Sequence, residues 1–310
     1  MLKTFSCLKE YAAQSDKFVR LTPDELRGLQ SVLLEMLVDF HHICTKNHLT
    51  YFLTGGSALG ARRHNGFIPW DDDIDVFMPR EDYERLSEIV SYECGSKYWV
   101  QNIHTSEKYD LNFAKFRKLG TKYVELYETE PEKAGICLDV YPLDATYQNR
   151  AKRLLCGIIN EMLFFISSCV RMYQKKEKLL NNINDVQLKR IIRIKSCIGK
   201  VFHSSKNPRK WYFYCENWCK KVIDNRSKYV VASSGRGHYF GEMYNREKLL
   251  PPVLTDFKGQ QVFVARDNDY LLGILYGPKY LLPPEEKQKE SHALLELIIN
   301  TEEKDDDTHE

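Results

Sequence analysis

The sequence lacks the features that mark several large classes of protein. Its first residues, MLKTFSCLKEYAAQ, hold no apolar core, so we expect no signal peptide. The most apolar run, Leu154 to Val170, carries Asn160 and Glu161 near its middle and is short for a bilayer crossing. We therefore expect a buried or interfacial helix there. No internal repeat is present, and the only low-complexity segment is the acidic tail, residues 301–310, which we expect to fray.

The cysteines do not show the spacing of a disulfide framework. The nine cysteines are an odd number without regular spacing, which favours free thiols in a reducing compartment and predicts a cytoplasmic protein. Cys215 and Cys219, with His203 upstream, resemble half of a zinc site. No second pair follows at zinc spacing, so we do not expect zinc.

Charge is present but uneven. The net charge is only +2, yet residues 151–230 contain 18 Lys and Arg against 5 Asp and Glu. Apolar and charged fractions of 43% and 28% are ordinary for a folded globular protein, and 310 residues are enough to bury a sizeable core. The small net charge of the whole chain therefore conceals a strongly basic middle region.

Periodicity predicts an α+β core followed by a helical region. Thr22-Pro23-Asp24-Glu25 is a strong helix start, and apolar residues recur at helical spacing to about Asn47. A second helix is expected over 80–90, and strands over 49–53, 74–78, 98–101, 111–116 and 135–141. The pattern is helical from about 150 to 225, and a short strand at 262–265 and a helix from 268 follow. We divide the chain into a core (1–150), a basic helical insertion (151–234), a C-terminal segment packing on the core (235–300) and the tail (301–310).

The stretch from Thr54 to Met78 carries the chemistry. The turn Gly55-Gly56-Ser57 follows a strand and opens a helix, where backbone N–H groups and the helix dipole favour phosphate. Basic residues come next in the sequence, and then four aspartates that lie within five positions. Such close carboxylates repel one another unless cations or water neutralise them. The basic residues are Arg62, Arg63 and His64, and the acids are Asp71, Asp72, Asp73 and Asp75.

Two of these acids and one distant acid are the predicted metal ligands. Strand alternation places Asp73 and Asp75 on one face, a pair suited to Mg²⁺ (or Mn²⁺). Asp139, in an otherwise apolar strand, is the expected third acid, or alternatively a buried acid paired with an arginine. For Asp72 we favour a solvated or loop-bonding role, and Asp144 looks like a turn residue or helix cap. An EF-hand is disfavoured, because the glycine and distal Glu of its loop are missing.

The order of these motifs resembles the nucleotidyltransferase superfamily. More narrowly, GGSALGARRHNGFIPWDDDIDVFMPREDY resembles the signature of the LicD family of phosphotransferases, typified by phosphorylcholine transferases and related to fukutin-related ribitol-phosphate transferases. ICLDVYPLD, FRKLGTK (116–122) and LYGPKYLLPPEEK (275–287) agree with it. The similarity touches about 26–144 and 240–292. Gly-Pro-Lys at 277–279 departs from the usual pattern, in which an acidic residue follows the glycine.

The resemblance implies a nucleotidyltransferase-like mixed-sheet core with flanking helices. It also implies a metal-dependent transfer of an alcohol phosphate, phosphorylcholine first among them, from a CDP-linked donor such as CDP-choline to a sugar hydroxyl. The acceptor would be a glycan or lipid-linked glycan of lipopolysaccharide, capsule or teichoic acid, and CMP would be released. Metal would be held by Asp73, Asp75 and Asp139. The expected substrate-binding and phosphate-binding residues are Gly55, Gly56, Ser57, Arg62, Arg63, His64, Trp70 and Arg117, and Trp70, Tyr141 or Tyr276 could face a choline headgroup.

Alternatives stay open. The protein could instead be a nucleotidyltransferase acting on a small molecule, a protein or an RNA end, or a non-catalytic protein that binds a membrane surface. The basic middle region has three interpretations: a solvated helical face, a peripheral contact with anionic lipid at the inner face of the membrane, or RNA binding. Nucleic acid is the least favoured, since no known RNA-binding module accompanies the charge.

Overall fold

The computed structural model describes residue 11, residue 15 and residues 17–204, 206–207, 209–222, 227–282 and 292–299. The expected acidic tail and the PPEEK segment (283–287) lie outside these residues. The described helices are α2 (Pro23–Lys46), α3 (Gly55–His64), α4 (Arg80–Cys94), η1 (Pro131–Lys133), α5 (Arg150–Gln174), α6 (Lys176–Asn182), α7 (Val186–Phe202), α8 (Lys210–Cys219), α9 (His238–Gly241), α10 (Arg246–Leu249) and α11 (Asn268–Tyr276). The described strands are β1 (Phe52–Leu53), β2 (Asp75–Pro79), β3 (Tyr98–Gln101), β4 (Ala114–Lys118), β5 (Lys122–Glu125), β6 (Cys137–Ala145), β7 (Tyr229–Val231), β8 (Met243–Asn245), β9 (Val253–Phe257), β10 (Gln260–Val264) and β11 (Leu294–Ile298).

One mixed sheet organises the core. Among the described residues its main path runs β3-β4-β6-β2-β1-β10-β9, and β7 and β8 extend it from β6. Strand β2 runs parallel to β6, whereas β1 and β2 are antiparallel. Strands β5 and β11 form a separate antiparallel pair. The expected α+β fold with a mixed sheet is confirmed.

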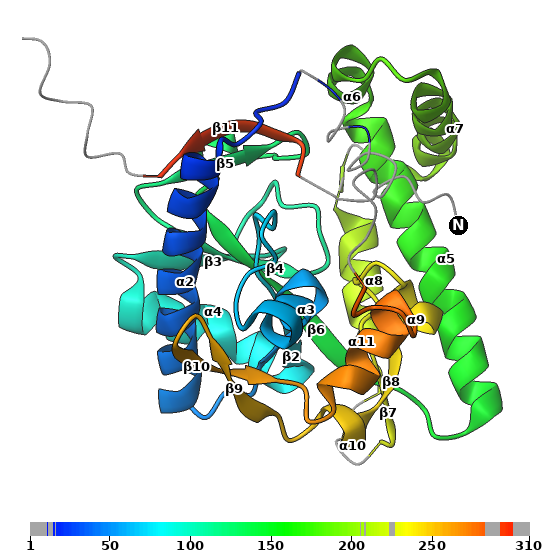
Figure 1. Ribbon diagram of the computed structural model, residues 1–310. Coiled ribbons are helices and arrows are strands. Elements are labelled where there is room, and N and C mark those ends of the chain that lie inside the picture. Colours follow the sequence, from blue (N-terminus) through cyan, green and yellow to red (C-terminus); the bar gives the residue numbers. More distant parts are fainter. Residues whose placement is uncertain are drawn as a thin grey trace, which may run out of the picture.

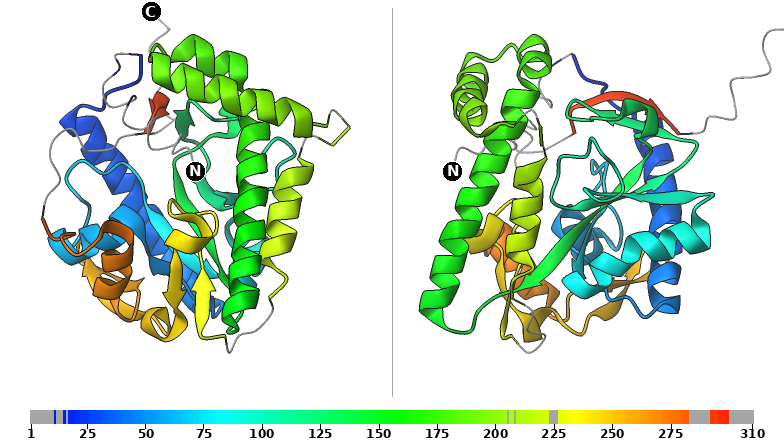
Figure 2. Two further views of the ribbon diagram at one scale, coloured as in Figure 1. Left: turned by 90° about the vertical axis from the view of Figure 1, so that its right-hand side faces the viewer. Right: turned by 180° about the vertical axis from the view of Figure 1, so that it is seen from behind.

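Helices enclose the sheet from two sides. Helix α2 runs along one side of the molecule, and α5, α7 and α8 form the opposite side (Figures 1 and 2). Helix α2 begins as expected, because the Thr22 side chain accepts from the Glu25 backbone while the Glu25 carboxylate accepts from the Thr22 N–H at 2.8 Å. The basic middle region is helical, as predicted.

The C-terminal segment supplies strands of the core. Strand β10 pairs in parallel with β1, and β8 pairs with β7, which in turn pairs with the end of β6. We expected residues 235–300 to pack on the core. In the structure two strands of this segment, β9 and β10, are part of the core sheet itself. The division of the chain into separate domains stays a prediction.

Glu242 is a buried acid beside this sheet. Its side chain lies where a Cβ on Gly235 would stand, and its Oε1 accepts from the Gly237 backbone N–H at 2.6 Å. Burial raises the pKa of Glu242 from 4.5 to about 7, since a charged carboxylate loses its hydration there.

The free energy of unfolding should consequently decrease as the pH rises, and this decrease should depend on Glu242. Between the unfolded pKa near 4.5 and the folded pKa near 7 the folded chain holds the extra proton, so folding weakens as pH rises through this window. Glu242→Gln removes this dependence. The free energy of unfolding of the variant minus that of the natural chain should therefore increase by about 2 kcal/mol from pH 5 to pH 8. Urea unfolding at the two pH values measures it. The exposed Glu132→Gln serves as control, and an equal pH response in the natural chain and Glu242→Gln would contradict the assignment.

Candidate active site

Neighbouring strands bring charged residues together on one face of the sheet. In the strand register Asp75 lies opposite Asp139, and Asp139 lies opposite Lys115, so the three side chains share a face. Lys115 Nζ donates to Asp139 Oδ1 at 2.9 Å and to Glu125 Oε2 at 3.2 Å. Asp139 is thus a nearly buried acid with a cationic partner, which is a lysine rather than an arginine.

The glycine turn makes room for two carboxylates. A Cβ on Gly55 would lie 2.7 Å from Asp75 Oδ2, and one on Gly56 would lie 2.6 Å from Asp71 Oδ2. Gly55 also has a φ of +54°, which favours glycine. The carboxylates of Asp71 and Asp75 therefore rest against the positive N-terminal end of α3.

Ser57 links this turn to the strand of the acids. Its Oγ accepts a hydrogen bond from the Asp75 backbone N–H at 2.9 Å and so fixes the start of β2. The predicted contacts of Gly55, Gly56 and Ser57 with donor phosphate stay predictions. Their positions show a second role, which is to hold the acids.

A histidine from the C-terminal segment completes an acidic cluster. His292 Nδ1 lies 2.8 Å from Asp72 Oδ1, and His292 Nε2 lies 3.3 Å from Asp73 Oδ2. Tyr123 donates to Asp72 Oδ2 at 3.2 Å. Asp72, Asp73 and His292 each offer a ligand atom within 4.8 Å of the others, so they form a possible metal site.

The placement of Asp72 corrects our expectation. We favoured a solvated or loop-bonding role; the solvated role is wrong, because the residue is only 8% exposed, while its bonds to Tyr123 and to His292, which lies outside any strand or helix, agree with loop bonding. Asp73 also differs in detail, because it precedes β2 instead of lying within the strand. The set that the sequence predicts (Asp73, Asp75 and Asp139) and the set with His292 share Asp73.

A small pocket lies between Asp139 and the cluster of Asp72, Asp73 and His292. The polar residues that line it are Asp72, Asp73, Lys115, Tyr123, Glu125, Asp139 and His292. Apolar side chains close the rest of the wall, Leu33 and Ile136 among them. Carboxylates outnumber cations in this lining, an arrangement that divalent metal would stabilise.

Two tyrosines lie beside the acids. Burial raises the pKa of Tyr141 well above its ordinary value, and the charges of Asp75 and Asp139 raise it further. Tyr276 is 43% exposed, but desolvation of its hydroxyl and the charges of Asp71 and Asp75 also raise its pKa. Both phenols therefore stay protonated as hydrogen-bond donors. Tyr141 also stacks on Phe113, with ring centroids 4.5 Å apart, and half-buried Trp70 packs against the main core.

The predicted basic residues lie at the far end of α3. Arg62 pairs with Asp269 at 2.8 Å, while Arg63 donates to the Tyr280 carbonyl at 3.4 Å. His64 ends the helix that Gly55 begins, and an α-helix of this length puts about 13 Å between its first and last residues. This placement disfavours direct help from these three side chains at the acids.

Arg117 is occupied inside the protein. It is 1% exposed and donates to Gln101 Oε1 at 2.6 Å, to the Gly135 carbonyl at 2.8 Å and to Glu128 Oε2 at 2.5 Å. This position favours a role in holding β4 to its neighbours over the predicted contact with substrate.

Sequence reasoning missed Lys115, Glu125 and His292. Lys115 has a local signal, since it stands between Ala114 and Phe116 in an apolar strand, where a lone cation needs a partner. His292 has none, because it reaches the site only through the pairing of β11 with β5.

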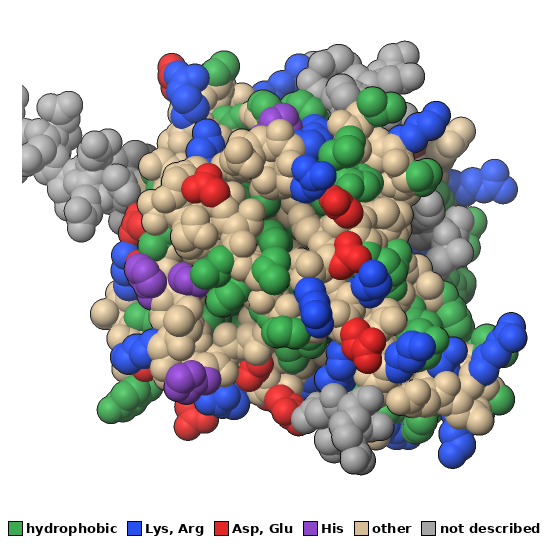
Figure 3. All heavy atoms as spheres, turned by 60° about the horizontal axis from the view of Figure 1, so that its bottom comes forward, with side chains coloured by type: hydrophobic (Ala, Val, Ile, Leu, Met, Phe, Trp, Pro, Cys, Tyr) green, Lys and Arg blue, Asp and Glu red, His purple; other side chains and the backbone are tan. Residues whose placement is uncertain are grey.

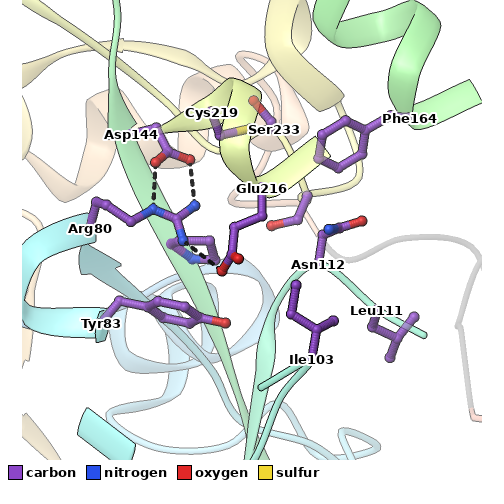
Figure 4. Close-up of a pocket in the computed structure, with 12 residues that line it drawn as sticks. Arg80, Tyr83, Ile103, Leu111, Asn112, Asp144, Phe164, Glu216, Cys219 and Ser233 are labelled. Carbon is purple, nitrogen blue, oxygen red and sulfur yellow. Dashed lines mark hydrogen bonds and ion pairs between the residues drawn. The ribbon is translucent and has the colours of Figure 1, made fainter. Parts of the chain in front are cut away.

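A second small pocket lies further along β6 (Figure 4). Arg80 makes a two-pronged contact with Asp144, at 2.6 and 2.9 Å, and approaches Glu216 at 3.7 Å. Asp144 was expected to be a turn residue or cap, and this was wrong: it lies within β6 and is 2% exposed. These ion pairs connect α4 and β6 with α8, so they stabilise the packing of the helical side against the core.

Comparison with known proteins finds similarity to one family. The domain described as "LicD/FKTN/FKRP, nucleotidyltransferase domain" matches residues 48–151, which include the glycine turn, the acids and Lys115. The lipopolysaccharide cholinephosphotransferase LicD of Haemophilus influenzae is 28% identical over 285 residues, covering 88% of this chain and 98% of that protein.

Two further relatives match over shorter lengths. An uncharacterized protein of Rickettsia prowazekii, RP689, is 39% identical over 95 residues, 27% of this chain and 35% of that one. Human ribitol 5-phosphate transferase FKRP is 46% identical over 46 residues, 15% of this chain and 9% of that one. These matches and the acidic site together show that the chain is similar to the LicD family, with the family's domain matching residues 48–151.

Proposed function

We propose that this protein transfers phosphorylcholine from CDP-choline to a sugar hydroxyl of a cell-surface glycan and releases CMP. The coarser statement, a LicD-type phosphotransferase acting on cell-surface glycan, is supported by the similarity that spans nearly the whole length of the cholinephosphotransferase. The observation that carries the proposal is the register that sets Asp75, Asp139 and Lys115 side by side next to Asp72, Asp73 and His292.

The donor set fits a divalent cation. Carboxylate oxygens suit Mg²⁺ or Mn²⁺, and one imidazole is acceptable to Mn²⁺. Such a cation, when bound, offsets the charge of a diphosphate and of the departing CMP. Asp73 would belong to the site in either of the two ligand sets.

The chain's own residues position and move protons. The acceptor hydroxyl attacks the phosphorus that bears the alcohol, its proton passes to a carboxylate oxygen, and the bond from that phosphorus to CMP breaks. Asp139 is the proposed base, because the Lys115 bond to Oδ1 fixes the orientation of its carboxylate. Tyr141 and Tyr276, protonated beside the acids, are placed to donate hydrogen bonds to phosphate oxygens or to face the headgroup.

The location is also part of the proposal. The eight cysteines within the described residues are all free. Free thiols suit a reducing compartment, so we propose that the reaction takes place in the cytoplasm, at the inner face of the membrane.

A donor panel tests the reaction. With Mg²⁺ and a glycan acceptor, CDP-choline should give CMP faster than CDP-ribitol or CDP-glycerol does, with phosphorylcholine appearing on the glycan. Pyrophosphate release from a nucleoside triphosphate, with no CMP from any CDP-alcohol, would instead identify a nucleotidyltransferase. No turnover with either class would identify a binding protein.

Removing the central acids should abolish turnover. Asp73→Asn and Asp75→Asn each keep the shape of the side chain and lose its charge, so CMP release should fall by about a thousandfold or more. Thermal unfolding midpoints should stay close to that of the natural chain. Asp256→Asn, an exposed acid in β9, is the matched control and should keep full activity. Full turnover in both site variants would refute the assignment.

Metal binding separates the two ligand sets. Added Mn²⁺ should raise the melting midpoint of the natural chain, since it binds the folded state. His292→Ala should weaken this response about tenfold in metal concentration if His292 is a ligand, whereas the exposed His42→Ala should not change it. An unchanged response in His292→Ala, with loss in Asp139→Asn, would select Asp73, Asp75 and Asp139 as the ligands.

A further inference from the structure

Helix α5 presents an apolar stripe to the outside. Leu154, Leu155, Ile158 and Met162 are 54%, 60%, 54% and 53% exposed, and their spacing puts them on one side of the helix. By length and composition alone α5 could cross a membrane. Its other side, however, packs on protein: buried Asn160 donates to Cys219 of α8 at 3.2 Å. The helix is therefore two-sided, with one side in the fold and one apolar side outside.

Helix α7 adds cations and further apolar side chains. Its sequence, VQLKRIIRIKSCIGKVF, has no acidic residue. Its exposed positions mix Arg190, Arg193 and Lys200 with Ile194 and Val201, which are 45% and 79% exposed. Basic and apolar side chains together on an exposed helix are typical of helices that lie in a lipid interface.

The two helices form one side of the molecule. Gly199 of α7 sits directly on α5, because a Cβ there would lie 2.0 Å from the Cys169 carbonyl oxygen. Both helices lie on the right in Figure 1 and face the viewer in the left view of Figure 2. Lys and Arg side chains and hydrophobic ones both appear on the right-hand side of Figure 3. We call the outward sides of α5 and α7 the lipid face.

We propose that the lipid face binds an anionic bilayer surface, with α5 and α7 lying in the plane of the headgroups. The charge of this region favours anionic lipid over a second copy of the chain as the binding partner of the lipid face. Residues 151–230 carry 18 Lys and Arg against 5 Asp and Glu, so anionic lipid is attracted. A second copy of the chain would bring the same excess of positive charge and would be repelled.

Lipid binding has a consequence for the reaction that rests on the proposed function. An enzyme held at the bilayer meets a lipid-linked glycan acceptor in two dimensions instead of three, which raises its effective concentration. The binding itself does not depend on catalysis, so it can be measured without donor or acceptor.

Vesicle sedimentation of the full chain tests the proposal. The chain should sediment with vesicles of phosphatidylglycerol and phosphatidylcholine, and less so with phosphatidylcholine alone or at high salt. Leu154→Glu/Ile158→Glu should weaken binding by about tenfold or more, because it removes apolar contacts and adds negative charge. The matched control is Val253→Glu/Leu254→Glu on β9, with side chains that are 44% and 54% exposed, and it should bind as the natural chain does.

Several outcomes would overturn the proposal. They are failure of the natural chain to bind anionic vesicles, equal binding by the α5 variant, and equal loss in the β9 control. A dimer in light scattering that the α5 variant alone converts to monomer would assign the stripe to a second copy. CMP release with a soluble glycan should be unchanged in the α5 variant, so loss of lipid binding and loss of the proposed reaction are told apart.

Discussion

Repulsion between carboxylates is the constraint around which this structure is built. Asp71, Asp72, Asp73 and Asp75 lie within five residues, and Asp139 joins them through the strand register. Each needs a compensating charge or dipole, because a buried ion without one is costly. The fold supplies three kinds of compensation: the ammonium of Lys115, the imidazole of His292, and the N-terminal end of α3. Each comes from a different part of the chain.

Lys115 shows how closely this compensation is matched. It is 6% exposed and its nitrogen contacts both Asp139 and Glu125, and the nearby acids hold the pKa of Lys115 well above its ordinary value despite burial. The ammonium is thus charged in the fold and offsets part of the negative charge of the acids around it.

Local signals predicted the parts of the fold that depend on neighbours in sequence. The capping box at Thr22 gave the start of α2, and apolar alternation gave β3 over Tyr98–Gln101 with the observed bounds. The acids Asp75 and Asp139 were recognised as a group because charge in an apolar strand is conspicuous. Their pairing in adjacent strands agrees with that recognition, while their predicted roles stay untested.

What could not be predicted depends on distance along the chain. His292 enters the site through the pairing of β5 with β11, whose partners are about 170 residues apart, and no local pattern encodes that pairing. The sequence also did not show how far Arg62 to His64 lie from the glycine turn, since closeness in sequence to Gly55 becomes separation along a helix, and the predicted role of these residues stays untested. Arg117 looked available because the sequence does not show that Gln101, Gly135 and Glu128 surround it.

The parallel pairing of β1 with β10 has a consequence for how the protein is made. Leu53 lies beside Val264, so the strand that leads into the glycine turn gains its neighbour only after some two hundred further residues have left the ribosome. Contacts this distant are slow to form. Residues 48–151, which match the family's domain, therefore do not contain the complete sheet or the complete site. On their own they would expose an edge of β1 and lack His292. During synthesis the acids therefore exist before the strand and the imidazole that contact them, and the whole set of site residues is present only after His292 has been added.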